Sequence, residues 1–203
     1  SDNAKFILSS MNGVFWDIII SICLTSVIMF IFLRTLRATF IAVITIPVCL
    51  LGSMSVLYWM GITINNMSMM GLSLAVGMVV DATTVVMENI TRHKESGKSA
   101  FRAAEDGTNE VAFAVLAGAA TTLAVFVPVA FMGGMMGRFF NSFGVTVAMT
   151  ISISLIISIT LTPFLCSRLM GRNQKTTALQ RNMERPFLWL EDRYRTALAF
   201  SVG

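Results

Sequence analysis

Residues 68–89 read SMMGLSLAVGMVVDATTVVMEN, an almost uninterrupted apolar stretch with the acidic residue Asp81 near its middle. As a helix that rises ~1.5 Å per residue, this stretch is long enough to cross a hydrocarbon core of ~30 Å. An ionisable side chain inside a membrane helix costs at least ~2.5 kcal/mol on insertion scales, so such residues are rare and usually lie on ion pathways. The stretch therefore predicts a membrane-spanning helix whose function depends on Asp81.

The helix face that carries Asp81 is narrow and polar. Gly77 precedes Asp81 by about one turn, Thr84 follows it by about one turn, and Glu88 follows it by two turns. Small and polar groups on one face of an otherwise apolar helix favour a functional interpretation of Asp81. The alternative is a protonated acid that neighbouring hydroxyl groups satisfy and that has only a structural role.

The composition excludes an ordinary soluble domain. Hydrophobic residues make up 55% of the chain and charged residues 13%, and the mean hydropathy is +0.75, whereas soluble domains of this length are far more polar. The three cysteines, Cys23, Cys49 and Cys166, lie in three different apolar runs without a CxxC spacing. We interpret them as small buried hydrophobic residues and predict neither a disulfide framework nor a metal site.

Five apolar runs predict a polytopic all-α membrane protein with crossings at about residues 13–33, 39–60, 67–91, 109–132 and 141–170. Every lysine and arginine except Lys5 and Arg138 lies at or beyond the inner ends of these helices, after the first, third or fifth crossing. The positive-inside rule then places the N-terminus outside and the C-terminal tail in the cytoplasm. This placement assigns the net charge of +4 to membrane topology and argues against a nucleic-acid partner.

Two cytoplasmic segments are predicted besides the crossings. Residues 99–110 are interpreted as a short surface helix with Ser99 as its N-cap, which Gly107 ends before the fourth crossing. Residues 171–185 are polar and predict a linker. Residues 186–203 predict an amphipathic helix at the membrane interface, followed by the start of a further element. A helix that docks on a partner protein is the alternative for this last segment.

Two further polar residues are weaker candidates. Asp17 lies near the outer end of the first crossing, directly after Trp16. We prefer to interpret it as an interfacial acid that reaches water, and a secondary role in proton coupling is the alternative. His93, the only histidine, lies among charged residues at the end of the third crossing, and we interpret it as a solvated surface residue.

Asp81 has no cationic partner in the interior of any predicted crossing, because every lysine and arginine lies in a loop or at a helix end. A buried carboxylate without a partner usually takes a proton instead. We therefore expect Asp81 to be neutral if the helices pack closely around it. Otherwise its face should stay open to water or to another subunit.

The chain also resembles a known family. GLSLAVGMVVDATTVVMENITRH (residues 71–93) resembles the fourth transmembrane helix of the resistance–nodulation–division (RND) efflux transporters. FLRTLRATFIAVITIPVCLLGS (residues 32–53) resembles the junction of their second and third helices. TLAVFVPVAFMGGMMGRFF (residues 122–140) and LTPFLCSRLM (residues 161–170) resemble their fifth and sixth helices. The resemblance covers essentially the whole chain, in order.

This resemblance implies that the chain supplies helices two to six of the first membrane repeat and the following cytoplasmic surface helix, as a fragment that lacks the porter domains and the second membrane half. Asp81 falls on the first acid of the family's proton-relay motif, and Glu88 and Asn89 fall on its E-N pair. Together with Gly77 and Thr84, these two residues form the predicted supporting face. Ala82 stands where the drug-exporting branch usually has a second acid, so the substrate and the number of protons remain open.

The function implied is substrate/proton antiport across the bacterial inner membrane by a secondary active transporter rather than an enzyme, with the proton as coupling ion and no cofactor. The implied partners are the lipid bilayer, the remaining half of the transporter with its porter domains, further copies in a homotrimer, a periplasmic adaptor and an outer-membrane channel. Two alternatives come from other classes. One is a cation-selective pore in which Asp81 selects the ion, and the other is a membrane scaffold or assembly module without transport activity.

Overall fold

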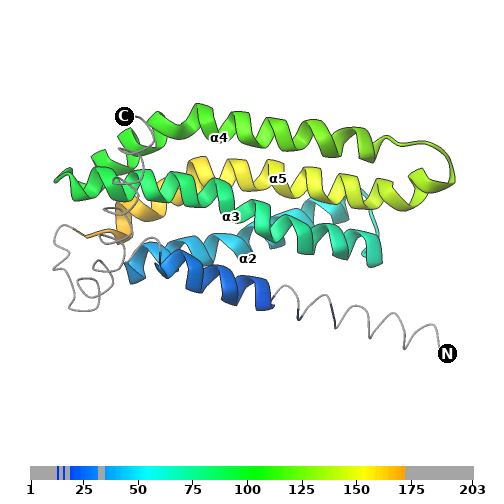
Figure 1. Ribbon diagram of the computed structural model, residues 1–203, viewed down its shortest axis with the longest axis horizontal. Helices are drawn as coiled ribbons and strands as arrows, with labels where there is room; N and C mark the ends of the chain where they lie inside the picture. The colour runs from blue at the N-terminus through cyan, green and yellow to red at the C-terminus, as the bar shows by residue number, and fades with distance from the viewer. Residues whose placement is uncertain (1–12, 14–15, 17–18, 32–34, 172–203) are drawn as a thin grey trace, which may run out of the picture.

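In the computed structural model, the described residues are 13, 16, 19–31 and 35–171. They form the long helices α2 (Leu36–Trp59), α3 (Asn66–Glu95), α4 (Ala100–Ala130) and α5 (Gly134–Leu169) and a shorter apolar helix at Ile19–Ile31. Each long helix is long and apolar enough to cross a membrane, and no strand occurs among the described residues. Figure 1 shows the helices running along the long axis of one bundle. The predicted all-α membrane fold is confirmed.

Three predicted features lie outside the described residues. These are Asp17, most of the 171–185 linker and the whole 186–203 amphipathic helix. Of the first predicted crossing, the helix Ile19–Ile31 is described. The orientation of the bundle in the membrane stays a prediction.

Polar side chains cap the N-terminal ends of α3 and α4. Before α3, the Asn65 side-chain oxygen accepts a hydrogen bond from the Ser68 amide (2.9 Å), and the Ser68 hydroxyl oxygen accepts one from the Asn65 amide (2.8 Å). This reciprocal capping box satisfies two amides that no helical carbonyl reaches. Before α4, the Ser99 hydroxyl oxygen accepts from the Arg102 amide at 3.4 Å, which confirms the prediction of Ser99 as an N-cap.

The expected break at Gly107 is wrong. α4 runs without interruption from Ala100 to Ala130, so the predicted surface helix of residues 99–110 is the first part of α4. The reason lies in the packing: a Cβ atom on Gly107 would lie 2.9 Å from the Ile90 Cα atom of α3. Glycine at this position permits close contact between two helices instead of ending one.

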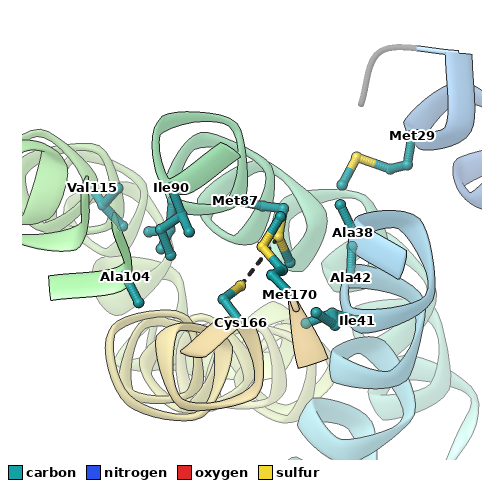
Figure 2. Packing of buried hydrophobic residues seen from close by; sticks show 11 residues of the cluster. Met29, Ala38, Ile41, Ala42, Met87, Ile90, Ala104, Val115, Cys166 and Met170 are labelled. Carbon is teal, nitrogen blue, oxygen red and sulfur yellow. Dashed lines mark hydrogen bonds between the residues drawn. The ribbon is translucent and has the colours of Figure 1, made fainter. Parts of the chain in front are cut away.

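The main hydrophobic core joins all four long helices to the helix Ile19–Ile31. Figure 2 shows these side chains, which are Met29, Ala38, Ile41, Ala42, Val86, Met87, Ile90, Ala104, Val115, Cys166 and Met170. The Cys166 thiol points at the Met87 sulfur, 3.4 Å away. Cys49 and Cys166 are buried as predicted, but Cys23 is exposed. The prediction for Cys23 is therefore wrong, because its helix Ile19–Ile31 is covered on only part of its surface.

Hydroxyl groups line the contact between α3 and α5. Buried hydroxyl residues recur at every fourth position of α5: Thr146, Thr150, Ser154, Ser158 and Thr162. The Ser158 hydroxyl lies 3.0 Å from the Thr83 hydroxyl of α3, and the Ser154 hydroxyl donates to the Val79 carbonyl at 3.3 Å. Short side chains let the two helices approach closely, and hydroxyls replace the water that a membrane interior lacks.

Close to the turn that joins them, α4 and α5 contact each other directly. A Cβ atom on Gly144 would lie 2.6 Å from the Ala130 nitrogen, so the backbones are in direct contact there. The Asn141 side-chain amide donates to the Ala130 carbonyl. The hydrogen bond from Asn141 satisfies a carbonyl at the end of α4, where no further turn of helix supplies a donor. Pro128 lies two residues earlier in the same helix.

Candidate functional site

A cavity of about 280 Å³ lies between α3, α4 and α5 beside Asp81. Apolar and small side chains make most of its wall, and the residues that line it are Met78, Asp81, Ala82, Val85, Ala114, Val115, Gly118, Ala119, Thr122, Ile151, Ser154 and Leu155. Among these lining residues Asp81 carries the single ionisable side chain. The cavity therefore combines one carboxyl group with an apolar wall.

Small residues on α4 create the space. Ala114, Gly118 and Ala119 face the cavity, and a Cβ atom built on Gly118 would meet no atom within 4 Å. A larger side chain at these positions would fill the volume. The sequence of α4 thus leaves room for water next to the carboxyl group, and a cavity of this size exceeds the ~30 Å³ that one water occupies.

Two hydroxyl groups accompany Asp81 in the cavity wall. The Thr122 hydroxyl of α4 donates to the Gly118 carbonyl at 3.0 Å, and the Ser154 hydroxyl of α5 donates to the Val79 carbonyl. Since each hydroxyl hydrogen is already used, the oxygens are left as acceptors for water or for a protonated acid. These two residues were not predicted as site residues. The signal for Ser154 was the four-residue repeat of hydroxyl residues in α5.

Asp81 itself is exposed at the surface of the chain. It belongs to an uncovered stripe on α3 that recurs every three or four residues: Leu74, Gly77, Asp81, Val85 and Glu88. Among the described residues no lysine, arginine or histidine forms an ion pair with it. Of the two expected arrangements, the open face is the one found, because neither α2, α4, α5 nor the helix Ile19–Ile31 covers this stripe.

The predicted supporting residues lie around Asp81 but outside the cavity wall. Thr84 donates to the Val80 carbonyl at 2.7 Å and lies 3.0 Å from the Met29 sulfur, so it faces the helix Ile19–Ile31. Gly77 and Glu88 are exposed on the uncovered stripe. None of these three lines the cavity.

Asn89, the fourth residue of the predicted supporting face, does not lie on the same face of α3 as Asp81 and Glu88. It is buried at 7% exposure, and its side-chain nitrogen donates to the Gly107 carbonyl at 2.7 Å and to a Glu110 oxygen at 3.2 Å. One residue of rotation along the helix, about 100°, separates the exposed Glu88 from the buried Asn89. Asn89 therefore connects α3 to α4.

Comparisons with known proteins identify relatives of this chain. A sequence profile of the AcrB/AcrD/AcrF family matches residues 1–203. The chain is 38% identical over 214 aligned residues to the multidrug resistance protein MdtC of Escherichia coli O6:H1 and to that of Pectobacterium atrosepticum. It is 39% identical to the MdtC protein of Escherichia coli K12. All of this chain is covered but only 21% of each relative, so the chain spans about a fifth of their length.

Proposed function

The chain belongs to the AcrB/AcrD/AcrF family of RND efflux transporters, and on this premise we propose that it forms part of the membrane domain of a proton-coupled exporter. Asp81 is the proton-relay carboxylate in this proposal. The observation that carries it is the position of Asp81 as the single ionisable group on the cavity between α3, α4 and α5. The printed name of the relatives, multidrug resistance protein, supports drug-like substrates for the whole transporter.

The proposed mechanism uses the change in charge of one carboxyl group. When Asp81 is protonated, it is neutral and tolerates an apolar environment. When it loses the proton, the charge favours water or a cation from a further part of the transporter. Each change of charge alters which packing of α3 against α4 and α5 is favoured, and a proton gradient can drive such a two-state element. Substrate export is then coupled to inward proton movement.

The proposal extends to the whole protein. The N-terminal side of the chain lies in the periplasm and the C-terminal tail in the cytoplasm of the bacterial inner membrane. The support is that every lysine and arginine except Lys5 and Arg138 lies at the end of, or after, the first, third or fifth predicted crossing. The intact transporter works as a trimer with a periplasmic adaptor and an outer-membrane channel. The proton is the coupling ion, and no other cofactor takes part.

The test replaces Asp81 by asparagine in the intact transporter. Asn keeps the size and the hydrogen-bonding groups but cannot carry a proton, so we expect drug export to fall to background while the amount of assembled protein in the membrane stays near normal. Asp106→Asn is the matched control, since Asp106 pairs with Lys98 at 2.7 Å and does not line the cavity. Equal loss of export in both variants would contradict the assignment of Asp81.

A further inference from the structure

Three donors of α3 converge on one carboxylate of α4. The Arg92 guanidinium donates to one Glu110 oxygen at 2.6 Å, and a His93 ring nitrogen lies 2.7 Å from the other. The Asn89 amide reaches the same second oxygen at 3.2 Å. The interpretation of His93 as a solvated residue is thus wrong, because its side chain is only 17% exposed and paired with Glu110.

Next to this network the two backbones touch. The Asn89 amide also donates to the Gly107 carbonyl, and a Cβ atom on Gly107 would lie within 3.0 Å of both the Cα and the nitrogen atom of Ile90. Any side chain at position 107 would push the helices apart, since a backbone atom cannot rotate away. We name the residues that make these contacts, Asn89, Arg92, His93, Gly107 and Glu110, the α3–α4 clasp.

The clasp lies one helical turn from the cavity. Val85 and Ala114 line the cavity wall, and Asn89 and Glu110 occupy the positions four residues further along α3 and four residues earlier on α4. In Figure 1 the end of α3 and the beginning of α4 meet at the same end of the bundle. Because a helix is stiff over a single turn, the distance between the helices at the clasp sets their distance at the near edge of the cavity.

We propose that the α3–α4 clasp positions Asp81 by fixing the width of the cavity and the access of water to it. The role of the clasp in proton coupling rests on the proposed function, whereas its effect on the distance between α3 and α4 does not. The exposed ion pair of Arg92 with Glu110 contributes little by itself. The buried Asn89 amide and the backbone contact at Gly107 hold the geometry, because opening them would leave polar groups without partners. A movement of α3 after a charge change at Asp81 then pivots about the clasp.

The experiment measures water access to the cavity by cysteine labelling. In the intact protein with the exposed Cys23 replaced by serine, Ala119→Cys places a thiol in the cavity wall, and its reaction rate with a membrane-impermeant maleimide is followed in open membrane fragments. Gly107→Ala separates the two helices at the clasp by steric contact, and Asn89→Ala removes the buried amide that bonds to Gly107 and Glu110. We expect both changes to raise the labelling rate about threefold or more.

Two controls make the result decisive. Glu105→Gln removes a carboxylate of the same helix whose one ion pair with the described residues is with Arg102, at 3.4 Å, and should leave the labelling rate unchanged. Gly133→Cys places a reference thiol in the turn at the other end of α4. This thiol should react at the same rate in the parent protein and in every variant. An unchanged rate at position 119 in both clasp variants would overturn the proposal, and so would an equal rise at position 133, which would indicate general loss of packing. Labelling needs no transport, so failure of the Asp81→Asn export test would contradict the proposed function alone.

Discussion

Replacing Gly144 by alanine should destabilise the bundle, although alanine is the better helix former. The added methyl carbon would lie 2.6 Å from the Ala130 nitrogen and 2.9 Å from the Ala130 Cα atom. Both atoms are backbone, so no rotamer change relieves the contact. An ordinary contact begins at 3.4 Å, which means that α4 and α5 must separate by about 0.8 Å at their closest point.

The cost follows from three contributions. Overpacking of this kind destabilises by ~1–3 kcal/mol. Separation of the helices also lengthens the hydrogen bond from Asn141 to the Ala130 carbonyl, and a lost bond of this type costs ~0.5–1.5 kcal/mol. The higher helix propensity of alanine offsets ~1 kcal/mol. The net loss is roughly 0.5–3.5 kcal/mol, which corresponds to a fall in apparent Tm of about 1–14 °C for a protein of this size.

The buried cysteines Cys49 and Cys166 provide the assay once the exposed Cys23 is replaced by serine. A dye that fluoresces on reaction with thiols reports their exposure when the protein, purified in detergent, is heated. The matched control is Gly118→Ala in the neighbouring helix, where the added Cβ atom meets nothing within 4 Å. This control should leave the apparent Tm unchanged or raise it slightly. A melting curve for Gly144→Ala that coincides with that of Gly118→Ala would refute the reasoning.

Three further predictions test other parts of the chain. Asn65→Ala removes the capping box of α3 and should lower stability by ~1 kcal/mol, whereas Asn66→Ala should not, and equal melting curves would count against the cap. Thr83→Val removes the buried hydroxyl pair with Ser158 and should lower the free energy of unfolding by ~0.6 kcal/mol, at most ~1.7 kcal/mol, in the same melting assay. A stabilised variant would show that the pair does not support the α3–α5 contact. A single cysteine replacing Lys175 should react with an impermeant reagent only from the cytoplasmic side, and labelling from the periplasm would contradict the predicted topology.

The class of the protein and the identity of its central carboxyl group could be predicted from the sequence. Hydropathy is a sum over neighbouring residues, so long apolar runs identify membrane helices without knowledge of their packing. The same reasoning singled out Asp81, because an acid in such a run is unusual in any arrangement of the helices. The capping signal at Ser99 was equally local, since a side chain bonds an amide three residues away.

Only the tertiary structure decided what surrounds that carboxyl group. Which face of each helix meets a neighbour depends on the rotation and crossing of the helices, and these are set by side chains far apart in the sequence. Periodicity therefore placed Thr84 and Glu88 beside Asp81, but the cavity brings Thr122 and Ser154 to it from two other helices. The same physical reason explains Gly107: as a local signal glycine predicts the end of a helix, and its contact with Ile90 of α3 makes it the point where two helices join.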